Sequence, residues 1–395
     1  MRLGYKHTVL SCFISYICQS VTINFAPLLF LTFSSEFDIP LASITALITV
    51  NFAIQLLTDM ISPRFVDKMG YRTSMLLAHG LCAIGMILLP TLPSLFGGFY
   101  GILAATVFYA IGGGLLEVLA SPIIDSCPVN NKSGLMSLLH SFYCWGIVVT
   151  VLISTAFFSL FGIENWRIMS LIWAALPIAN FIFVLFVPMP EPPPVEVGKT
   201  DLKTVFSSKI FWIFLAMMFA SGASEMAIQQ WASTFAESAL KVDKSVGDLI
   251  GVCGYAVMMG SVRILHGKFS EKLPKKLTLL VCGFMTLGCF MTVALAKNPI
   301  IGFVGCVFCG FAVGIFWPGT FTLATSKMPG CTTAMFALLS LAGDIGCTTG
   351  PTVTGFVSDA FDGNLRMGIL VASIFPIIMI LALSLLGLSS KETKL

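Results

Sequence analysis

The chain has 395 residues, of which 57% are hydrophobic and only 10% are charged. A soluble protein has ~25% charged residues, so this composition excludes a soluble globular domain and predicts a polytopic membrane protein. The formal net charge of only +3 argues against a nucleic-acid partner.

Runs of ~20 apolar residues predict twelve transmembrane helices. The uncharged first run is too long for the core of a signal peptide, so we expect it to be retained as the first helix. The predicted helices are residues 8–33, 41–61, 73–92, 99–125, 135–161, 166–187, 210–237, 248–266, 277–296, 299–325, 333–358 and 367–388. The Pro-rich, charged stretch 188–209 predicts a cytoplasmic linker between two six-helix halves, residues 1–187 and 210–395.

The distribution of basic residues predicts the topology. Sixteen of the 22 Lys and Arg residues lie on the side of the N-terminus and five on the other, while Arg263 lies within a predicted helix. By the positive-inside rule, both termini are cytoplasmic. We expect a multi-pass, monomeric protein of the cell membrane, with the lipid bilayer as its surroundings.

Two loops repeat one pattern. Asp67-Lys68-Met-Gly70-Tyr-Arg72 follows the second predicted helix, and Glu271-Lys272-Leu-Pro274-Lys-Lys276 follows the eighth, so acid, base and turn residue recur 204 positions later. The offset indicates that the two halves are repeats. Transporters built from such repeats place the substrate near the membrane midplane.

The fourth helix contains an acid inside an apolar run. An ionised carboxylate at membrane depth costs several kcal/mol, so we expect Glu117 to face protein or a water-filled cavity. The preceding glycines, 112–114, allow a neighbouring helix to come close. Steps of four place Gly113, Glu117 and Ser121 on one face, which is a candidate transport site.

The fifth and seventh helices supply further polar side chains. His140 and Tyr143 share a face of the fifth, where His140 is either a ligand or a packing residue. Ser221, Glu225 and Gln229 form a stripe along the seventh. Gln230 and Trp231 follow, and because Trp231 points away from Glu225 on a regular helix, we expect these two to join the site only where the helix is broken.

Other buried polar residues allow two interpretations. Asp344 in the eleventh helix either carries a coupling proton or compensates the charge of Arg263. Asn51, Gln55 and Asp59 step by four along the second helix and either line the transport path or mark its interfacial end.

No motif for a cofactor or catalysis accompanies these residues. The sequence has no phosphate-binding loop, no metal-ligand spacing and no nucleophile elbow, so we expect no cofactor, no metal and no enzymatic activity. The twelve cysteines lie in or beside apolar runs, which favours packing over disulfides or metal binding.

The loop Asp67-Lys68-x-Gly70-x-Arg72 resembles the signature between helices 2 and 3 of the major facilitator superfamily. The resemblance implies that family's twelve-helix fold over the whole chain, although Pro63 and Pro274 depart from its pattern. It also implies a cytoplasmic gate in which the loop acid pairs with nearby bases. The implied gate residues are Asp67, Lys68, Gly70, Arg72, Glu271 and Lys272.

Three segments resemble the fucose-permease-like sugar symporters of that superfamily. These segments are Gly114-Leu-Leu-Glu117 with Ser121-Pro122, Leu139-His140-Ser-Phe-Tyr143 with Gly146, and Gly222-Ala-Ser-Glu225 through Trp231. The resemblance implies that Glu117 is a protonatable group and that the seventh helix faces a sugar. Members of this branch can carry an acid on the first helix, where Asn24 is the nearest polar candidate here.

The leading hypothesis is alternating-access uptake of a small polar solute, a monosaccharide, coupled to protons. The rivals are a proton-driven drug or metabolite exporter, an intramembrane enzyme with Glu117 and Glu225 as a carboxylate pair, and a nutrient receptor without transport. Exporters of the superfamily carry Gly-x-x-x-Gly-Pro on helix 5, where this chain has Gly146-Ile-Val-Val-Thr150-Val. The internal repeat counts against the enzyme and the receptor.

Overall fold

The computed structural model describes residues 3–129, 132–191, 206–269, 273–328 and 333–392. All regular structure in these ranges is helical, and eleven helices are long and apolar enough to cross a membrane. The eleventh predicted span corresponds to α16 (Thr333–Ala360), which has the length of a span but is rich in Gly, Thr and Ser. The predicted all-α membrane architecture is confirmed.

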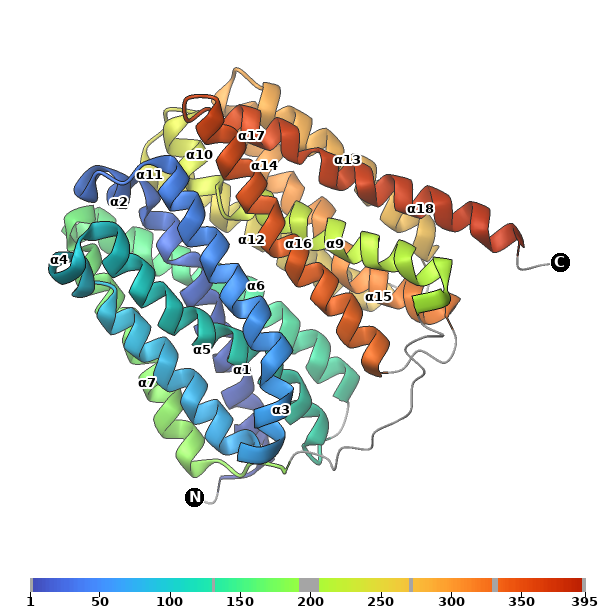
Figure 1. Cartoon of the computed structure of the whole chain (residues 1–395), viewed down its shortest axis with the longest axis horizontal. Helices are drawn as coiled ribbons and strands as arrows, with labels where there is room; N and C mark the ends of the chain where they lie inside the picture. Colours follow the sequence, from blue (N-terminus) through green and yellow to red (C-terminus); the bar gives the residue numbers. More distant parts are fainter. Residues whose placement is uncertain (1–2, 130–131, 192–205, 270–272, 329–332, 393–395) are drawn as a thin grey trace. The chain divides into compact units, whose positions relative to one another are not determined.

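The chain divides into two compact units, residues 1–196 and 197–395, and the dividing point lies within the stretch predicted as a linker. The first unit is drawn in blue to green in Figure 1. Its elements are α1 (Tyr5–Asn24), η1 (Ala26–Leu29), α2 (Phe30–Phe37), α3 (Leu41–Leu88), α4 (Leu92–Phe96), α5 (Gly98–Ser126), α6 (Lys132–Phe161), η2 (Ile163–Asn165) and α7 (Trp166–Phe186).

The second unit runs from green to red in Figure 1. Its elements are α9 (Lys209–Gln229), α10 (Ala232–Ser238), α11 (Lys244–Val246), the π-helix η3 (Gly247–Cys253), α12 (Gly254–Phe269), α13 (Lys275–Leu295), α14 (Pro299–Val313), α15 (Phe316–Lys327), α16, α17 (Leu365–Ala372) and α18 (Ile374–Glu392).

Several predicted spans are broken rather than continuous. In the first unit the helix is interrupted after Asn24, where Pro27 removes a backbone donor, and in the second unit after Gln229. Phe25 and Gln230, the first residues of the two breaks, lie 205 positions apart, close to the offset of the repeated loops. The internal repeat therefore extends to the interruption of each unit's first helix.

The second and third predicted spans are joined at a single residue of unusual conformation. Gly70 has φ 78° and ψ 160° inside α3, so the helix is interrupted there, between the predicted spans 41–61 and 73–92. A side chain is strained at this φ, so glycine is needed for the turn. The prediction of Gly70 as the turn residue is confirmed.

The glycines of α5 face three different neighbours, because consecutive residues of a helix point ~100° apart. A methyl group on Gly112 would lie 2.6 Å from Cys82 N. One on Gly113 would lie 3.0 Å from Thr22 Oγ1, and one on Gly114 would lie 3.2 Å from Gln55 Cα. The neighbours are α1 and both halves of α3. The predicted close approach at these glycines is confirmed.

In each unit, an arginine near the start of a late helix contacts residues at the ends of earlier helices. These arginines are Arg167 at the start of α7 and Arg366 at the start of α17. Arg167 pairs with Glu36 of α2 and lies 4.7 Å above the ring of Trp166. Arg366 donates to the carbonyls of Ala239, after α10, and Ala296, after α13. The same task is performed by an ion pair in one unit and by backbone carbonyls in the other.

Helices α9 and α16 cross at small residues. A methyl group at Gly346 would overlap the carbonyl oxygen of Phe219 and lie 2.9 Å from Ala223 N. Backbone atoms cannot move aside as a flexible side chain can, so this crossing requires glycine. Small residues are the usual means of bringing membrane helices into contact.

We predict that Gly346→Ala lowers the stability of the purified protein by ~1–3 kcal/mol, the usual effect of overpacking. Thermal unfolding in detergent measures the change. The matched control is Gly288→Ala in α13, where no atom lies within 4 Å of the added methyl group. That variant should unfold at or above the wild-type temperature, because alanine favours the helix over glycine. Equal melting of both variants would contradict the close crossing.

Candidate functional site

In the first unit, the acid of α5 is held by an amide of α1. Glu117 is half-buried, and its Oε2 accepts a hydrogen bond of 2.6 Å from Gln19 Nε2. The short distance is typical of a donor facing an ionised carboxylate. Gly113 lies one turn before Glu117 and lets α1 come close enough for the amide to reach it.

Tyr16 links this acid to α6. Its hydroxyl lies 3.5 Å from Ser121 Oγ, and its ring meets the ring of His140 edge-on at a centroid distance of 5.6 Å. The structure therefore brings together the predicted residues Glu117, Ser121 and His140 around a tyrosine that sequence reasoning missed. The spacing of three between Tyr16, Gln19 and Thr22 on α1 was the available signal.

The other predicted residues of this unit are more deeply placed. Asn24 is 2% exposed at the end of α1, and its Nδ2 donates to Ser20 O of its own helix at 2.9 Å. Tyr143 is 8% exposed on α6. The contact from the first helix to Glu117 comes from Gln19, which the sequence did not single out.

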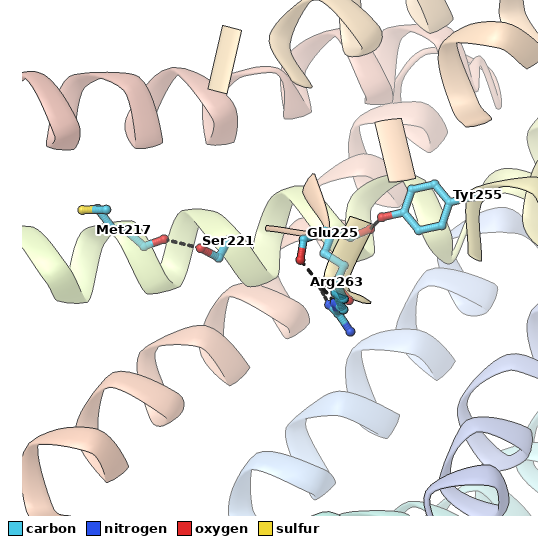
Figure 2. Close-up of polar contacts among 6 residues, drawn as sticks. Met217, Ser221, Glu225, Tyr255 and Arg263 are labelled. Atoms are coloured by element: carbon cyan, nitrogen blue, oxygen red, sulfur yellow. Dashed lines mark hydrogen bonds and ion pairs between the residues drawn. The ribbon is translucent and has the colours of Figure 1, made fainter. Parts of the chain in front are cut away.

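In the second unit, the acid of α9 forms a buried ion pair. Arg263 of α12 donates through Nη2 to both oxygens of Glu225, at 3.0 and 2.9 Å, as Figure 2 shows. Glu225 is 5% exposed, and the Tyr255 hydroxyl donates to its backbone carbonyl at 3.1 Å. Glu225 is thus a partner of Arg263 that the sequence did not predict, and the two roles considered for Asp344 stay predictions. Asp344 is half-buried on α16.

The same arginine also completes a helix break. Arg263 Nε donates to Gly314 O at 3.2 Å, between α14 and α15. In a continuous helix this carbonyl would accept from the residue four positions on, which is Pro318 and has no N–H. One guanidinium thus binds a carboxylate and a carbonyl that the sequence leaves open.

The three residues of the predicted polar stripe on α9 are all buried, and Ser221 bonds within its own helix. Ser221 is fully buried, and its hydroxyl donates to Met217 O of its own helix at 2.8 Å (Figure 2), so it is satisfied locally. Gln229 and Gln230 are each 2% exposed at the end of the helix. Within the described part of the chain, Gln230 Nε2 has no hydrogen-bond partner.

The helix is broken at Gln230 and Trp231, which is the condition set for these residues to join the site. Trp231 nevertheless has another role. It is fully buried, and its indole N–H donates to Pro351 O of α16 at 3.0 Å. The ring therefore packs inside its unit, and a contact of Trp231 with a solute stays a prediction.

The loop predicted as a gate contains a helix cap. Arg72 donates to the carbonyls of Val184, Leu185 and Val187 at 2.6, 2.9 and 2.8 Å, at the C-terminal end of α7. These carbonyls lack helical partners and carry partial negative charge, so the guanidinium stabilises the helix end. Lys68 is exposed. Glu271, Lys272 and the side chain of Asp67 lie outside the described residues.

A buried network that sequence reasoning missed ties α1, α3 and α7 together. His79 Nδ1 lies 2.7 Å from Met75 O and therefore carries a proton, which leaves Nε2 to accept from Asn180 Nδ2 at 2.7 Å. Asn180 Oδ1 accepts from Ser11 Oγ at 3.1 Å. A neutral histidine satisfies every bond, so this network is a structural element of the first unit.

The described ranges contain no group of three or more His, Cys, Asp or Glu side chains that could hold a metal ion. No disulfide joins the eleven cysteines in the same ranges, and most of their thiols are buried.

Comparison with known proteins gives a family and a fold. A family model described as Major Facilitator Superfamily matches residues 8–351. Bypass of stop codon protein 6 of Saccharomyces cerevisiae is 26% identical over 145 residues, which is 37% of this chain. The chain spans only 28% of the length of that relative.

Three solved structures share the fold. A bacterial homologue of the human lysosomal transporter Spinster, inward-facing and unoccupied, has a TM-score of 0.79 at 16% identity, over 96% of both chains. The D-xylose-proton symporter has a TM-score of 0.75 at 13% identity, over 96% of both chains. The E. coli fucose:proton symporter has 0.65 at 16% identity, over 97% of this chain and 99% of that one.

We predict that Arg263→Met destabilises the protein by about 3–5 kcal/mol, because Glu225 is left as an unpaired buried charge. Adding Glu225→Met should restore most of the loss, since apolar residues then replace the pair, while the open carbonyl of Gly314 keeps the recovery incomplete. Thermal unfolding measures both variants.

The control is Arg167→Met, which breaks the ion pair between Arg167 and Glu36. The side chain of Arg167 is 39% exposed and that of Glu36 is 32% exposed. Exposed pairs contribute little, so its melting temperature should fall much less. A double variant no more stable than Arg263→Met alone would show that Glu225 and Arg263 are not energetically coupled.

Proposed function

The chain belongs to the major facilitator superfamily, so it is a membrane transporter and not an enzyme, and from that premise we propose its solute and its coupling ion. The solute is a small polar molecule, a monosaccharide, taken up by alternating access together with protons. The membrane is the plasma membrane, with both termini cytoplasmic. The rival hypotheses, an exporter and a receptor, give other outcomes in the experiments below.

One contrast carries the proposal: the acid of α5, Glu117, and the acid of α9, Glu225, have partners of different charge. Glu225 is held by a guanidinium, so the pair is already neutral. Glu117 is held by the amide of Gln19, which is uncharged. An amide donates to a carboxylate and accepts from a carboxylic acid, so it fits both protonation states. We therefore assign the proton coupling to Glu117, whose amide partner can accompany both forms of the carboxyl group.

Asp344 is the second candidate for proton coupling, since it is a half-buried acid in a helix of span length. The gate remains a further proposal. It comprises Asp67, Lys68, Gly70, Glu271 and Lys272, while Arg72 supports it by fixing the end of α7.

The preference for a neutral polyhydroxyl solute rests on the side chains around the break of α9. Gln229 and Gln230 offer amides, and the Glu225–Arg263 pair offers donors and acceptors without net charge. An ionic solute would have to compete with that pair, whereas hydroxyls can add to it. The names of two structural neighbours, symporters of fucose and of xylose with protons, agree with this class. The proposed ligands are Asn24, Glu117, His140, Tyr143, Glu225, Gln229 and Gln230.

We predict that Glu117→Gln keeps solute exchange down a gradient and loses pH-driven accumulation. The glutamine still accepts from Gln19 but no longer binds and releases a proton. Uptake into proteoliposomes with and without a pH gradient measures both. Asp359→Asn, at an exposed acid near the end of α16, is the control and should accumulate solute like the wild type. Full uphill uptake by Glu117→Gln would refute the assignment, and dependence on a sodium gradient would favour Asp344 and Asn24.

The substrate class is tested by competition. We predict that neutral monosaccharides bind the wild type and that Gln229→Ala weakens their binding roughly 3- to 10-fold, as expected for one lost hydrogen bond. A panel of sugars, amino acids and lipophilic cations is measured on both proteins. Binding of lipophilic cations alone would indicate the exporter. Sugar binding without counterflow would indicate the receptor.

A further inference from the structure

Three buried amides in the first unit, Gln19, Asn51 and Gln55, each leave one polar atom without a partner among the described residues. Two of them pack near the same part of α5: Gln19, whose free atom is the acceptor Oε1, and Gln55, whose free atom is the donor Nε2. Gln19 is 3% and Gln55 is 5% exposed, so water does not readily reach either. Buried polar groups in native proteins are nearly always satisfied, so each requires an explanation.

The two amides approach the same turn of α5 from different helices. Gln19 on α1 bonds to Glu117 at 2.6 Å. Gln55 on α3 packs at the preceding turn: its Nε2 lies 3.8 Å from the position of a methyl group on Gly113, and its Cα lies 3.2 Å from one on Gly114. The absence of side chains at these glycines lets α3 bring the amide of Gln55 to the turn of α5 that precedes Glu117.

The neighbouring side chains do not take up the free atoms. Thr22 belongs to α1 and packs against Gly113. Its hydroxyl donates to Gln19 O of the same helix at 2.8 Å. Asn51, one turn before Gln55 on α3 and 7% exposed, has an Oδ1 that also lacks a partner among the described residues. The face of α3 toward this region thus carries two amides with unmet capacity.

We propose that Gln19 and Gln55 form a hydroxyl-binding subsite beside Glu117, which takes a neutral polyhydroxyl ligand. A hydroxyl donates one hydrogen bond and accepts others, so it satisfies the free acceptor of Gln19 and the free donor of Gln55. A cation would leave the Gln55 nitrogen unsatisfied. An anion would meet the carboxylate of Glu117. The subsite rests on the proposed function and adds two ligands that the sequence did not single out for sugar binding.

The test is Gln55→Met, which keeps the length of the side chain and removes the free donor. Without ligand, the variant should melt at a higher temperature than the wild type, because an unsatisfied buried group has been deleted. Its affinity for the bound monosaccharide should fall roughly 3- to 10-fold, the effect of one hydrogen bond. Within a panel of monodeoxy analogues, one analogue should bind the variant and the wild type equally, since it lacks the hydroxyl that Gln55 contacts.

Ser74→Ala is the matched control. Ser74 is fully buried in α3, and its Oγ likewise has no partner among the described residues. This variant should also melt higher than the wild type, with unchanged ligand affinity. The control separates the removal of any unsatisfied group from the removal of a ligand contact.

The outcomes distinguish the subsite from the proposed function. A Gln55→Met protein that melts lower without ligand, or that binds every analogue as the wild type does, overturns the subsite. If no monosaccharide binds the wild type but glycerol or myo-inositol does, with the predicted loss in Gln55→Met, the sugar proposal fails and the subsite stands. If no hydroxyl compound binds the wild type, both fail.

Discussion

The second unit depends on one guanidinium. A bilayer offers no water to backbone groups, so every interruption of a helix must be repaired from within the protein. Pro318 cannot donate to the carbonyl of Gly314, and α9 places the carboxylate of Glu225 in the same interior. Arg263 donates hydrogen bonds to both groups. The break in one helix and the acid in another are therefore parts of a single arrangement. Removing the arginine leaves a buried charge and a buried acceptor together.

In the first unit, uncharged groups form hydrogen bonds with the acid of α5 and with the buried histidine. Its acid is held by an amide, and its buried histidine is fixed as a neutral donor and acceptor by Met75 and Asn180. A charged partner fixes the protonation of a carboxylate, because losing the charge loses the ion pair. An amide does not, because it turns to suit either form. The repeated fold thus holds one acid with a guanidinium and one with an amide, and the coupling proposed for Glu117 rests on that difference.

The sequence predicted what depends on periodicity and on desolvation. The helical spans, the role of Gly70 and the close packing at the glycines of α5 follow from local conformation and from the sizes of side chains. The partner of Arg263 did not follow, because Glu225 lies 38 residues away on another helix and no spacing rule connects them. Gln19 and Tyr16 were missed for a different reason: an acid stands out in an apolar run by its desolvation cost, whereas an amide or a phenol there is an ordinary interhelical contact. The burial of Trp231 depends on α16, which no local pattern of α9 reports.

The glycine contacts explain why the polar groups can be so specific. In each unit, the helix that carries the acid is packed against a neighbour through glycine: α5 against α1 and α3, and α9 against α16. Where glycine lets two helix backbones pack closely, few conformations are open to the neighbouring side chains. Glu117 therefore bonds to Gln19 within one turn of Gly113.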